Sequence, residues 1–259
     1  MSLALGPLLR YSGCAWYRTA PRSDHIKPAG RHQVGWTPHK LGTDLTAESA
    51  CLGFAEANCY IVGEPGGEAV VVDPGSSEPR DVEAIAWRIR ELGLTVREIV
   101  NTHGHPDHMA GNDLLKRRLN ATVAVHTLDA MKLTDPVKNA STLFGMEIYV
   151  DPPDRLLEDG DVVRFGRHEL AVLHTPGHSA GGIALLGDGF VLTGDTLFAG
   201  SIGRSDLPCS SDEGSIAYEV LMKSIRERLM SLPDETVVLP GHGPATTIGD
   251  ERRTNPFVR

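Results

Sequence analysis

Four side chains that can bind a metal ion lie within six consecutive residues of the sequence: His103, His105, Asp107 and His108. Frequency counting on the composition expects such a string on the order of once in a thousand chains of this kind. Neutral imidazole and carboxylate groups suit zinc or iron, and burying several strongly hydrated groups in one turn costs free energy unless they share a cation. The string therefore predicts a metal site.

Three further candidate ligands each follow a predicted strand and have a glycine beside them: His178, Asp195 and His242. Glycine lets the backbone turn sharply and approach a ligand closely. Any one of these residues alone would more often be an ordinary turn residue than a ligand. Together with the first four they supply five histidines and two aspartates, which is enough for two cations.

Short strands and amphipathic helices must bring these residues together. The sequence predicts strands over residues 58–62, 69–73, 98–102, 122–126, 162–165, 169–174, 182–186, 190–193 and 236–239. It predicts helices over residues 80–92, 112–119 and 128–133, and another after a capping box at residues 210–213. The alternation of strands and helices indicates a layered α/β fold.

The order and separation of the seven candidate ligands resembles the metallo-β-lactamase fold superfamily. Within it, the sequence is most similar to glyoxalase II-like (hydroxyacylglutathione hydrolase-like) enzymes of the short bacterial type. That narrower resemblance rests on Asn-Cys-Tyr-Ile-Val at 58–62, Gly-Asp-Thr-Leu-Phe at 194–198, Gly-Arg-Ser-Asp-Leu-Pro at 203–208, and the tail over 241–257. It covers about residues 50–259 and implies a four-layered αββα sandwich with the metals at one edge.

The resemblance also implies which residues hold which of two divalent cations. The first would be bound by His103, His105 and His178, the second by Asp107, His108 and His242, with Asp195 bridging the two. The spacing fits this division, because alternate side chains of an extended segment point the same way. Zinc is the expected metal, with iron and manganese as alternatives. Asp107 and Asp195 are the expected catalytic residues.

A hydroxide shared by the two cations is the nucleophile that the resemblance implies, because metals lower the pKa of bound water. It would attack a thioester such as a hydroxyacylglutathione, so no serine or cysteine nucleophile is required. A glutathione persulfide dioxygenase with the same ligands around a single iron is the main alternative, although its usual sequence differs from this one at Thr196 and Phe198. A lactonase or another ester hydrolase is the second alternative.

Other proteins with related metal motifs fit less well. Flavodiiron proteins would have an acid in place of His105, and the common zinc β-lactamases would have a cysteine in place of Asp195. A binding module stabilised by metal would close the coordination of its ions. Seven ligands around two metals leave room for water, which favours an enzyme.

The N-terminal part of the chain differs from the rest in charge and pattern. Residues 1–40 carry a net charge of +5, whereas the remaining 219 residues carry −14, for a total of −9. This segment holds four prolines, two of the three tryptophans and no sustained hydrophobic period. We therefore expect an extended arm over residues 1–47, with Trp16 and Trp36 as packing anchors, before a hydrolase domain over residues 48–259.

Composition argues against several kinds of partner. A net charge of −9 and only 5% aromatic residues do not favour nucleic-acid binding. No apolar run approaches the roughly 18 residues of a membrane-spanning helix, and no signal peptide is expected. The four cysteines form no CxxC pair, which favours a cytoplasmic protein. The expected partner is a small-molecule substrate, and homo-oligomerisation is left open.

Overall fold

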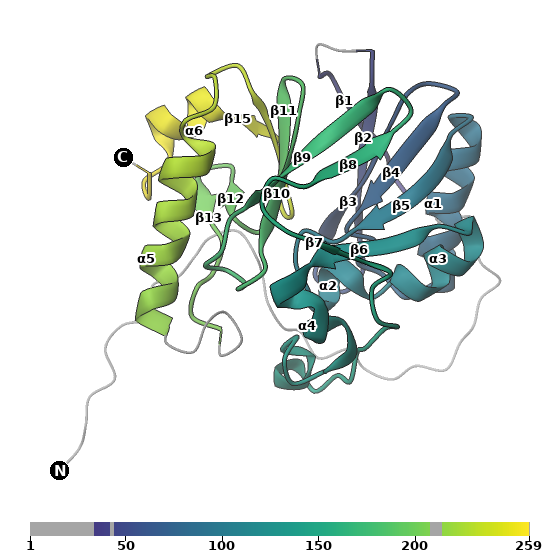
Figure 1. Ribbon diagram of the computed structural model, residues 1–259, viewed down its shortest axis with the longest axis horizontal. Coiled ribbons are helices and arrows are strands. Elements are labelled where there is room, and N and C mark those ends of the chain that lie inside the picture. Colours follow the sequence, from purple (N-terminus) through teal and green to yellow (C-terminus); the bar gives the residue numbers. More distant parts are fainter. Residues whose placement is uncertain (1–33, 42–43, 208–213, 259) are drawn as a thin grey trace. The chain divides into compact units, whose positions relative to one another are not determined.

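The computed structural model describes residues 34–41, 44–207 and 214–258, apart from the side chains of residues 214–216. These residues belong to one compact unit, residues 33–259. Within this unit two β-sheets face each other, and helices cover their outer faces (Figure 1). The expected capping box at residues 210–213 and the expected anchor Trp16 lie outside the described residues.

Seven strands form the first sheet, in the order in which they follow one another along the chain. They are β1 (Thr37–His39), β2 (Thr46–Leu52), β3 (Ala57–Gly63), β4 (Glu68–Val72), β5 (Thr95–Val100), β6 (Thr122–His126) and β7 (Arg155–Leu157). Neighbours from β1 to β4 are antiparallel, and those from β4 to β7 are parallel. Helical segments follow β4 and β5 in the parallel part, as parallel connections require.

Six strands form the second sheet, in the order β15, β14, β11, β10, β9, β8. Their bounds are Val162–Phe165 (β8), His168–His174 (β9), Ile183–Gly187 (β10), Phe190–Gly194 (β11), Val237–Pro240 (β14) and Thr246–Thr247 (β15). The β11–β14 pair is parallel and the other pairs are antiparallel. A small hairpin, β12 (Leu197–Phe198) and β13 (Ser201–Ile202), follows β11.

The helices are short and lie on the outer faces or at the edges of the sheets. They are α1 (Pro79–Glu91), α2 (Pro106–Met109), α3 (Asn112–Leu119), α4 (Ala130–Thr134), α5 (Gly214–Ser224) and α6 (Ile248–Thr254). A 3₁₀ turn (Thr127–Asp129) precedes α4, another (Ser141–Phe144) precedes β7, and a π-helical turn (Ile225–Leu229) continues α5. Among the described residues, no helix combines the length and the apolar character that a membrane crossing requires.

Side chains alternate between the layers along each strand. On β3, Ile61 packs in the cluster shared with α1 and α3, whereas Val62 packs in the cluster between the two sheets. On β11, Leu192 faces the first sheet and Val191 packs in the cluster shared with α5. The described residues therefore fill the three spaces between four layers with apolar side chains, and the expected αββα sandwich is confirmed.

The boundary expected between residues 47 and 48 lies inside strand β2. This strand pairs with β3 along its length from Thr46 to Leu52, and β1 pairs with β2, so the sheet begins well before residue 48. Trp36 is partly buried against the cluster that α1 and α3 share with the first sheet. Residues 1–33 of the expected arm lie outside the described residues.

Candidate metal centre

The first four candidate ligands lie in the turn from β5 into α2. His103 and His105 precede the helix, and His105 has an extended backbone, with φ −77° and ψ 152°. Pro106 then starts α2, because its ring fixes φ in the helical range and it has no N–H that the first turn would leave unpaired. Asp107 and His108 are on this helix. The turn therefore presents two ligands from the segment before the helix and two from the helix itself.

The other three candidates come from the second sheet. His178 lies in the loop between β9 and β10, Asp195 follows β11 directly, and His242 follows β14. Because β11 and β14 are parallel neighbours, their ends lie at the same edge of the sheet. A Cβ atom on Gly241 would lie 2.2 Å from Asp195 Oδ1, so glycine is needed there for the close approach of the two loops.

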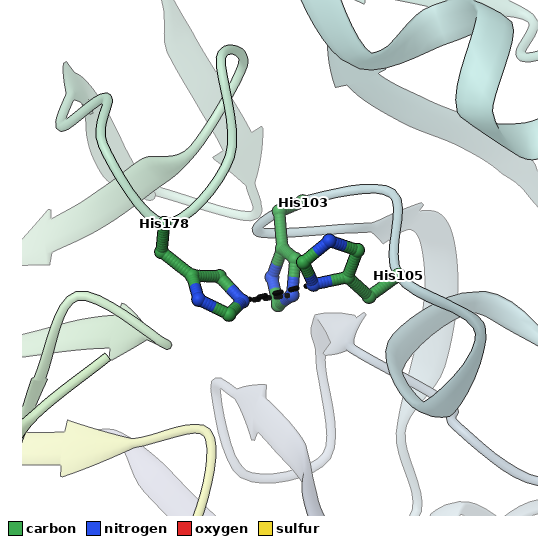
Figure 2. A group of neighbouring side chains, drawn as sticks. All are labelled: His103, His105 and His178. Atoms are coloured by element: carbon green, nitrogen blue, oxygen red, sulfur yellow. Dashed lines mark hydrogen bonds between the residues drawn. The ribbon is translucent and has the colours of Figure 1, made fainter. Parts of the chain in front are cut away.

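His103, His105 and His178 form the first group, and their rings point toward one another (Figure 2). His178 Nε2 lies 2.8 Å from His105 Nδ1 and 3.2 Å from His103 Nε2. All three side chains are buried. Three ring nitrogens from two separate loops thus converge on one point, which is the arrangement that a cation bound to imidazole requires.

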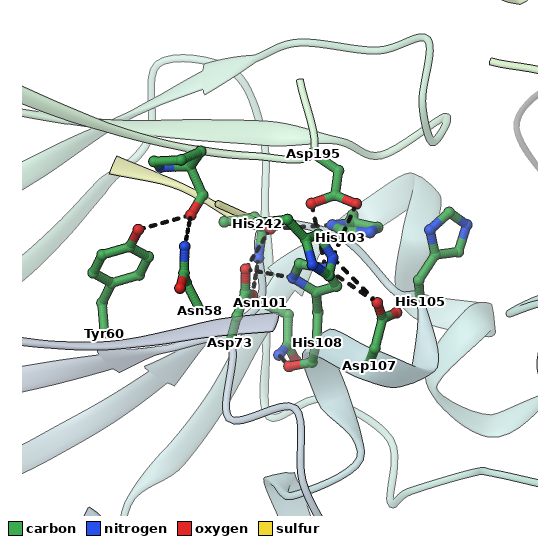
Figure 3. Close-up of polar contacts among 12 residues, drawn as sticks. Asn58, Tyr60, Asp73, Asn101, His103, His105, Asp107, His108, Asp195 and His242 are labelled. Atoms are coloured by element: carbon green, nitrogen blue, oxygen red, sulfur yellow. Dashed lines mark hydrogen bonds and ion pairs between the residues drawn. The ribbon is translucent and has the colours of Figure 1, made fainter. Parts of the chain in front are cut away.

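Asp107, His108 and His242 form the second group (Figure 3). Asp107 Oδ2 lies 3.3 Å from His242 Nε2 and 3.8 Å from His108 Nε2. His108 is fully buried, whereas the side chain of His242 is 26% exposed. This group therefore lies nearer to solvent than the first.

Asp195 lies against both groups. Its Oδ2 is 3.5 Å from His178 Nε2 of the first group and 3.6 Å from His242 Nε2 of the second. Its Oδ1 is 3.4 Å from His108 Nε2. The structure thus brings all seven candidate ligands together and puts one carboxylate between the two groups.

Two buried atoms at the centre lack a hydrogen-bond partner among the described residues. They are His108 Nε2 and Asp195 Oδ1, which face each other without hydrogen-bond geometry. Buried polar atoms are nearly always satisfied, and leaving one unsatisfied costs on the order of 1–3 kcal/mol. A cation among these atoms would satisfy both, so the residues present fit a metal centre.

Hydrogen bonds behind three of the histidines direct their Nε2 atoms into the centre. His178 Nδ1 lies 2.7 Å from the carbonyl oxygen of Arg204, which can only accept a hydrogen bond, so Nδ1 carries the proton. His108 Nδ1 lies 2.9 Å from Asp73 Oδ2, and His103 Nδ1 lies 3.1 Å from Thr102 Oγ1. Such partners orient metal-binding histidines and select the tautomer that can donate a lone pair.

The charge states also suit a cation. Burial, with neighbouring positive charge, holds the pKa of His103 and His105 well below the usual value, so both are neutral donors. Burial alone would raise the pKa of Asp195, but His242 and His108 lower it below its usual value. Burial would lower the pKa of His108, yet Asp195, Asp107 and Asp73 raise it well above normal. A bound cation would replace the proton on His108, because metal binding competes with protons for the same lone pair.

Sequence reasoning missed Asp73, which follows β4 at a positive φ of 54°. Besides His108, it accepts hydrogen bonds from the backbone N–H and the hydroxyl of Thr102, at 2.8 and 2.6 Å. An acid at the end of a buried strand is the sequence signal that could have revealed it, because such groups often serve a site rather than the core.

Asn58 and Tyr60 hold the loop that carries His242. The Asn58 side-chain amide donates to the carbonyl oxygens of Pro240 and Gly243, both at 2.9 Å, and Tyr60 Oη donates to Pro240 at 2.7 Å. Both residues belong to β3 of the first sheet (Figure 3). They tie the two sheets together beside the second group of ligands.

The sequence model of the metallo-beta-lactamase superfamily matches residues 52–242. This chain belongs to the metallo-beta-lactamase superfamily. Members of the superfamily bind divalent metal ions, and the two clusters of histidine and aspartate described above supply the side chains for this. The chain is therefore a metallo-hydrolase of the superfamily.

Several known proteins resemble most of this chain. Hydroxyacylglutathione hydrolase GloC of Haemophilus influenzae is 32% identical over 207 residues, covering 78% of this chain and 93% of GloC. The crystal structure of TTHA1623 in a di-iron-bound form is 40% identical, with a TM-score of 0.68, over 81% of this chain and 98% of that one. The structure of BLEG-1 B3 metallo-beta-lactamase is 34% identical, with a TM-score of 0.74, over 82% of this chain and 99% of that one.

Proposed function

We propose that this metallo-hydrolase has a dinuclear centre and cleaves a thioester such as a hydroxyacylglutathione. The observation that carries the proposal is the position of Asp195, whose Oδ2 lies 3.5 and 3.6 Å from histidine nitrogens of two different ligand groups. A carboxylate has two oxygens and can therefore serve two cations at once. The di-iron form of TTHA1623, a 40% identical structure, supports two ions.

The residues divide into two sets of donors in this proposal. His103, His105 and His178 would hold one divalent cation, Asp107, His108 and His242 the other, and Asp195 both. Zinc, iron and manganese all accept imidazole and carboxylate, with zinc the expected ion. Two such ions supply a hydroxide near neutral pH by lowering the pKa of the water that they bind.

The charges of the protein side chains favour attack on a carbonyl group. Asp107 and Asp195 are the only acids among the seven donors, so two divalent cations would keep net positive charge at the centre. Net positive charge stabilises both an attacking hydroxide and the oxyanion that forms at the substrate. In this proposal Asp195 contributes to catalysis by binding both cations. Asp107 contributes by binding, together with His242, the cation of the more exposed second group.

The proposal of a thioester substrate rests on the similarity of the chain to known proteins and on the glyoxalase II-like segments at 58–62, 194–198, 203–208 and 241–257. GloC, a hydroxyacylglutathione hydrolase, is 32% identical across 93% of its length. A second candidate is β-lactam hydrolysis, which the 34% identity to BLEG-1 B3 metallo-beta-lactamase favours. Both reactions need a hydroxide directed at a carbonyl carbon, which the proposed centre would supply.

We further propose a cytoplasmic location. Cys51 and Cys59, the cysteines within the described residues, are free thiols, which is typical of a reducing compartment. Fractionation of cells followed by detection of the protein tests this directly, and recovery outside the cytoplasmic fraction would refute it.

Metal content and substrate range, measured on the same purified sample, test the proposed function. The panel contains S-D-lactoylglutathione, a lactone, a β-lactam, and glutathione persulfide under air with oxygen uptake recorded. Two metal ions per chain with turnover of the thioester would support the proposal. One iron per chain with oxygen uptake would instead identify a persulfide dioxygenase. The double variant His103→Ala/His242→Ala, which loses one ligand from each group, serves as the control for activity that comes from a contaminant.

A further inference from the structure

A buried ion pair beside the first group of histidines has no part in the chemistry described so far. Asp129 ends the 3₁₀ turn before α4 and is fully buried, and Lys132 on α4 is 6% exposed. Lys132 Nζ lies 3.4 Å from Asp129 Oδ1. Burying two charges costs more free energy than the pair commonly returns, so a buried pair calls for a reason other than stability.

The contacts of Asp129 reach two loops that come from different sheets. Its Oδ2 accepts a hydrogen bond from the backbone N–H of Gly104 at 2.8 Å. Its Oδ1 accepts one from the backbone N–H of Gly181, also at 2.8 Å. The hydroxyl of Ser179 donates to Oδ2 of Asp129 and accepts from Lys132 Nζ. One carboxylate therefore fastens both loops.

These loops are the ones that carry the first group of ligands. Gly104 lies between His103 and His105, while Ser179 follows His178 directly. The three imidazoles converge only if the two loops keep their spacing, because His178 Nε2 must stay within about 3 Å of nitrogens on the other loop. Asp129 spans that gap with hydrogen bonds from backbone groups on both sides.

Two glycines allow the loops to come this close to the ion pair. A Cβ atom on Gly104 would lie 2.6 Å from Lys132 Cβ, and one on Gly181 would lie 2.6 Å from the backbone nitrogen of Asp129. Real Cβ atoms do not approach other heavy atoms so closely, so each position needs glycine for steric reasons. The local sequence on both loops is thus adapted to contact with Asp129 and Lys132.

Different residues hold the second group. Asp73 bonds to His108, and Asn58 bonds to the backbone on both sides of the His242 loop. Asp73 also reaches the first group through Thr102, whose hydroxyl lies 3.1 Å from His103 Nδ1. The hydrogen bonds of Asp129, by contrast, go to the two loops that carry the first group.

We propose that Asp129 and Lys132 are positioning residues that set the metal affinity of the first group, His103, His105 and His178, and not that of the second. This inference rests on the proposed dinuclear centre. Asparagine at position 129 would keep one acceptor oxygen and replace the other by an NH₂ group, which cannot accept. Either Gly104 N–H or Gly181 N–H would then face a donor, and the loop concerned would move away.

The test measures zinc affinity by competition with a chromophoric chelator in two backgrounds that each keep one group. In His242→Ala the first group remains, and adding Asp129→Asn should lower zinc affinity by about tenfold or more, as outer partners of metal ligands do. In His103→Ala the second group remains, and adding Asp129→Asn should change affinity by less than about twofold. Ser179→Ala, which removes only the bridging hydroxyl, repeats the test in case Asp129→Asn fails to fold.

A matched control comes from a buried acid in another ion pair. Glu48 is 5% exposed and accepts two hydrogen bonds from Arg88, both at 2.6 Å, which join β2 to α1. Glu48→Gln should lower the unfolding midpoint of the metal-free protein without changing zinc affinity in either background. A merely structural role of Asp129 would give the same pattern as this control.

The outcomes separate the inference from the proposal on which it rests. Equal losses in both backgrounds, or no loss in the His242→Ala background, would overturn the inference. A wild-type chain that binds one ion would contradict the dinuclear centre. The inference would then require that His103→Ala abolishes binding of that ion and that Asp129→Asn lowers the affinity for it. Failure of either result would overturn the inference. A wild-type chain that binds no ion would overturn both.

Discussion

Replacing Asp73 by asparagine should weaken the second metal position while leaving the fold intact. Asp73 Oδ1 accepts from Thr102 N at 2.8 Å, and Oδ2 lies 2.6 Å from Thr102 Oγ1 and 2.9 Å from His108 Nδ1. Because both oxygens are acceptors, His108 donates a proton from Nδ1, which leaves Nε2 as the atom that would bind the cation. Asparagine has a single acceptor oxygen, so it can accept a hydrogen bond from Thr102 N–H or from His108 Nδ1, but not from both. Its NH₂ group would face either the N–H of Thr102 or Nδ1 of His108.

The structure sets the size of the expected effect. An NH₂ group facing His108 favours the tautomer with the proton on Nε2, which cannot bind a cation. An NH₂ group facing Thr102 leaves a buried N–H unpaired, at a cost of about 1–3 kcal/mol in stability. Loss of such a partner typically lowers metal affinity by about 10- to 100-fold. We therefore expect a loss of about 1.4–2.7 kcal/mol in the binding free energy of one of the two ions.

Chelator competition on the wild type, Asp73→Asn and a control variant measures this effect. Asp81→Asn is the control, because Asp81 accepts a hydrogen bond from Ser76 at 2.6 Å and lies on α1. One ion should dissociate from Asp73→Asn at a chelator concentration at which the wild type and Asp81→Asn retain two. Wild-type affinity for both ions in Asp73→Asn would refute the reasoning, as would an equal loss of both.

Four further predictions follow from the site and the core. Asp195→Asn should lower hydrolysis by several orders of magnitude and weaken both metal positions, and near-normal turnover with two ions bound would exclude a bridging role. His178→Ala and His242→Ala should each deplete one position, and crystal structures with both histidines on one cation would contradict this. Phe190→Ala, in the fully buried layer between the sheets, should cost about 3–5 kcal/mol of unfolding free energy in urea titrations. Deletion of residues 1–33 should leave two ions per chain by elemental analysis, since all seven ligands lie between residues 103 and 242, and loss of an ion would assign a ligand to that segment.

Elements with strong local patterns were predictable from the sequence. The strand expected at residues 122–126 and the helix expected at 112–119 have those bounds in the structure. Strand β6 has the β-branched residues Thr122, Val123 and Val125. Helix α3 follows Gly111 and is capped at its C-terminus by Asn120, in the left-handed region. In such segments the secondary structure that the local sequence favours is the one that the fold contains.

Elements whose partners lie far away in the sequence were missed. Strand β2 contains Glu48, whose burial makes sense only once Arg88 on α1 pairs with it. Strand β15 has two residues, which is too few for any periodicity, and α6 is mostly polar, with Ile248 as its apolar residue. Strand β2 forms because β1 and β3 of the first sheet pair with it, and β15 forms because β14 of the second sheet pairs with it. A single sequence does not show these pairing edges.

The same distinction applies to the site. The string from His103 to His108 is local, so residue types and spacing reveal it. Asp73 and Asp129 act through residues that lie 25 to 52 positions away in the sequence, and neither has a neighbour in sequence that suggests a role. The backbone carbonyl of Arg204, which orients His178, is invisible to any reading of side-chain types.

The division of the ligands between the two sheets has a consequence for the order of events during protein synthesis. His103 follows β5, whereas His242 follows β14, so two ligands that must meet at one centre lie 139 positions apart in the sequence. Long-range contacts of this kind form late, because the intervening chain loses much of its conformational freedom when the loop closes. An emerging chain therefore exposes a cluster of four free ligands in its turn after β5 well before Asp195 and His242 have left the ribosome. Any ion captured at that stage would be held by a partial set of ligands, and it could exchange until Asp195 and His242 join the centre.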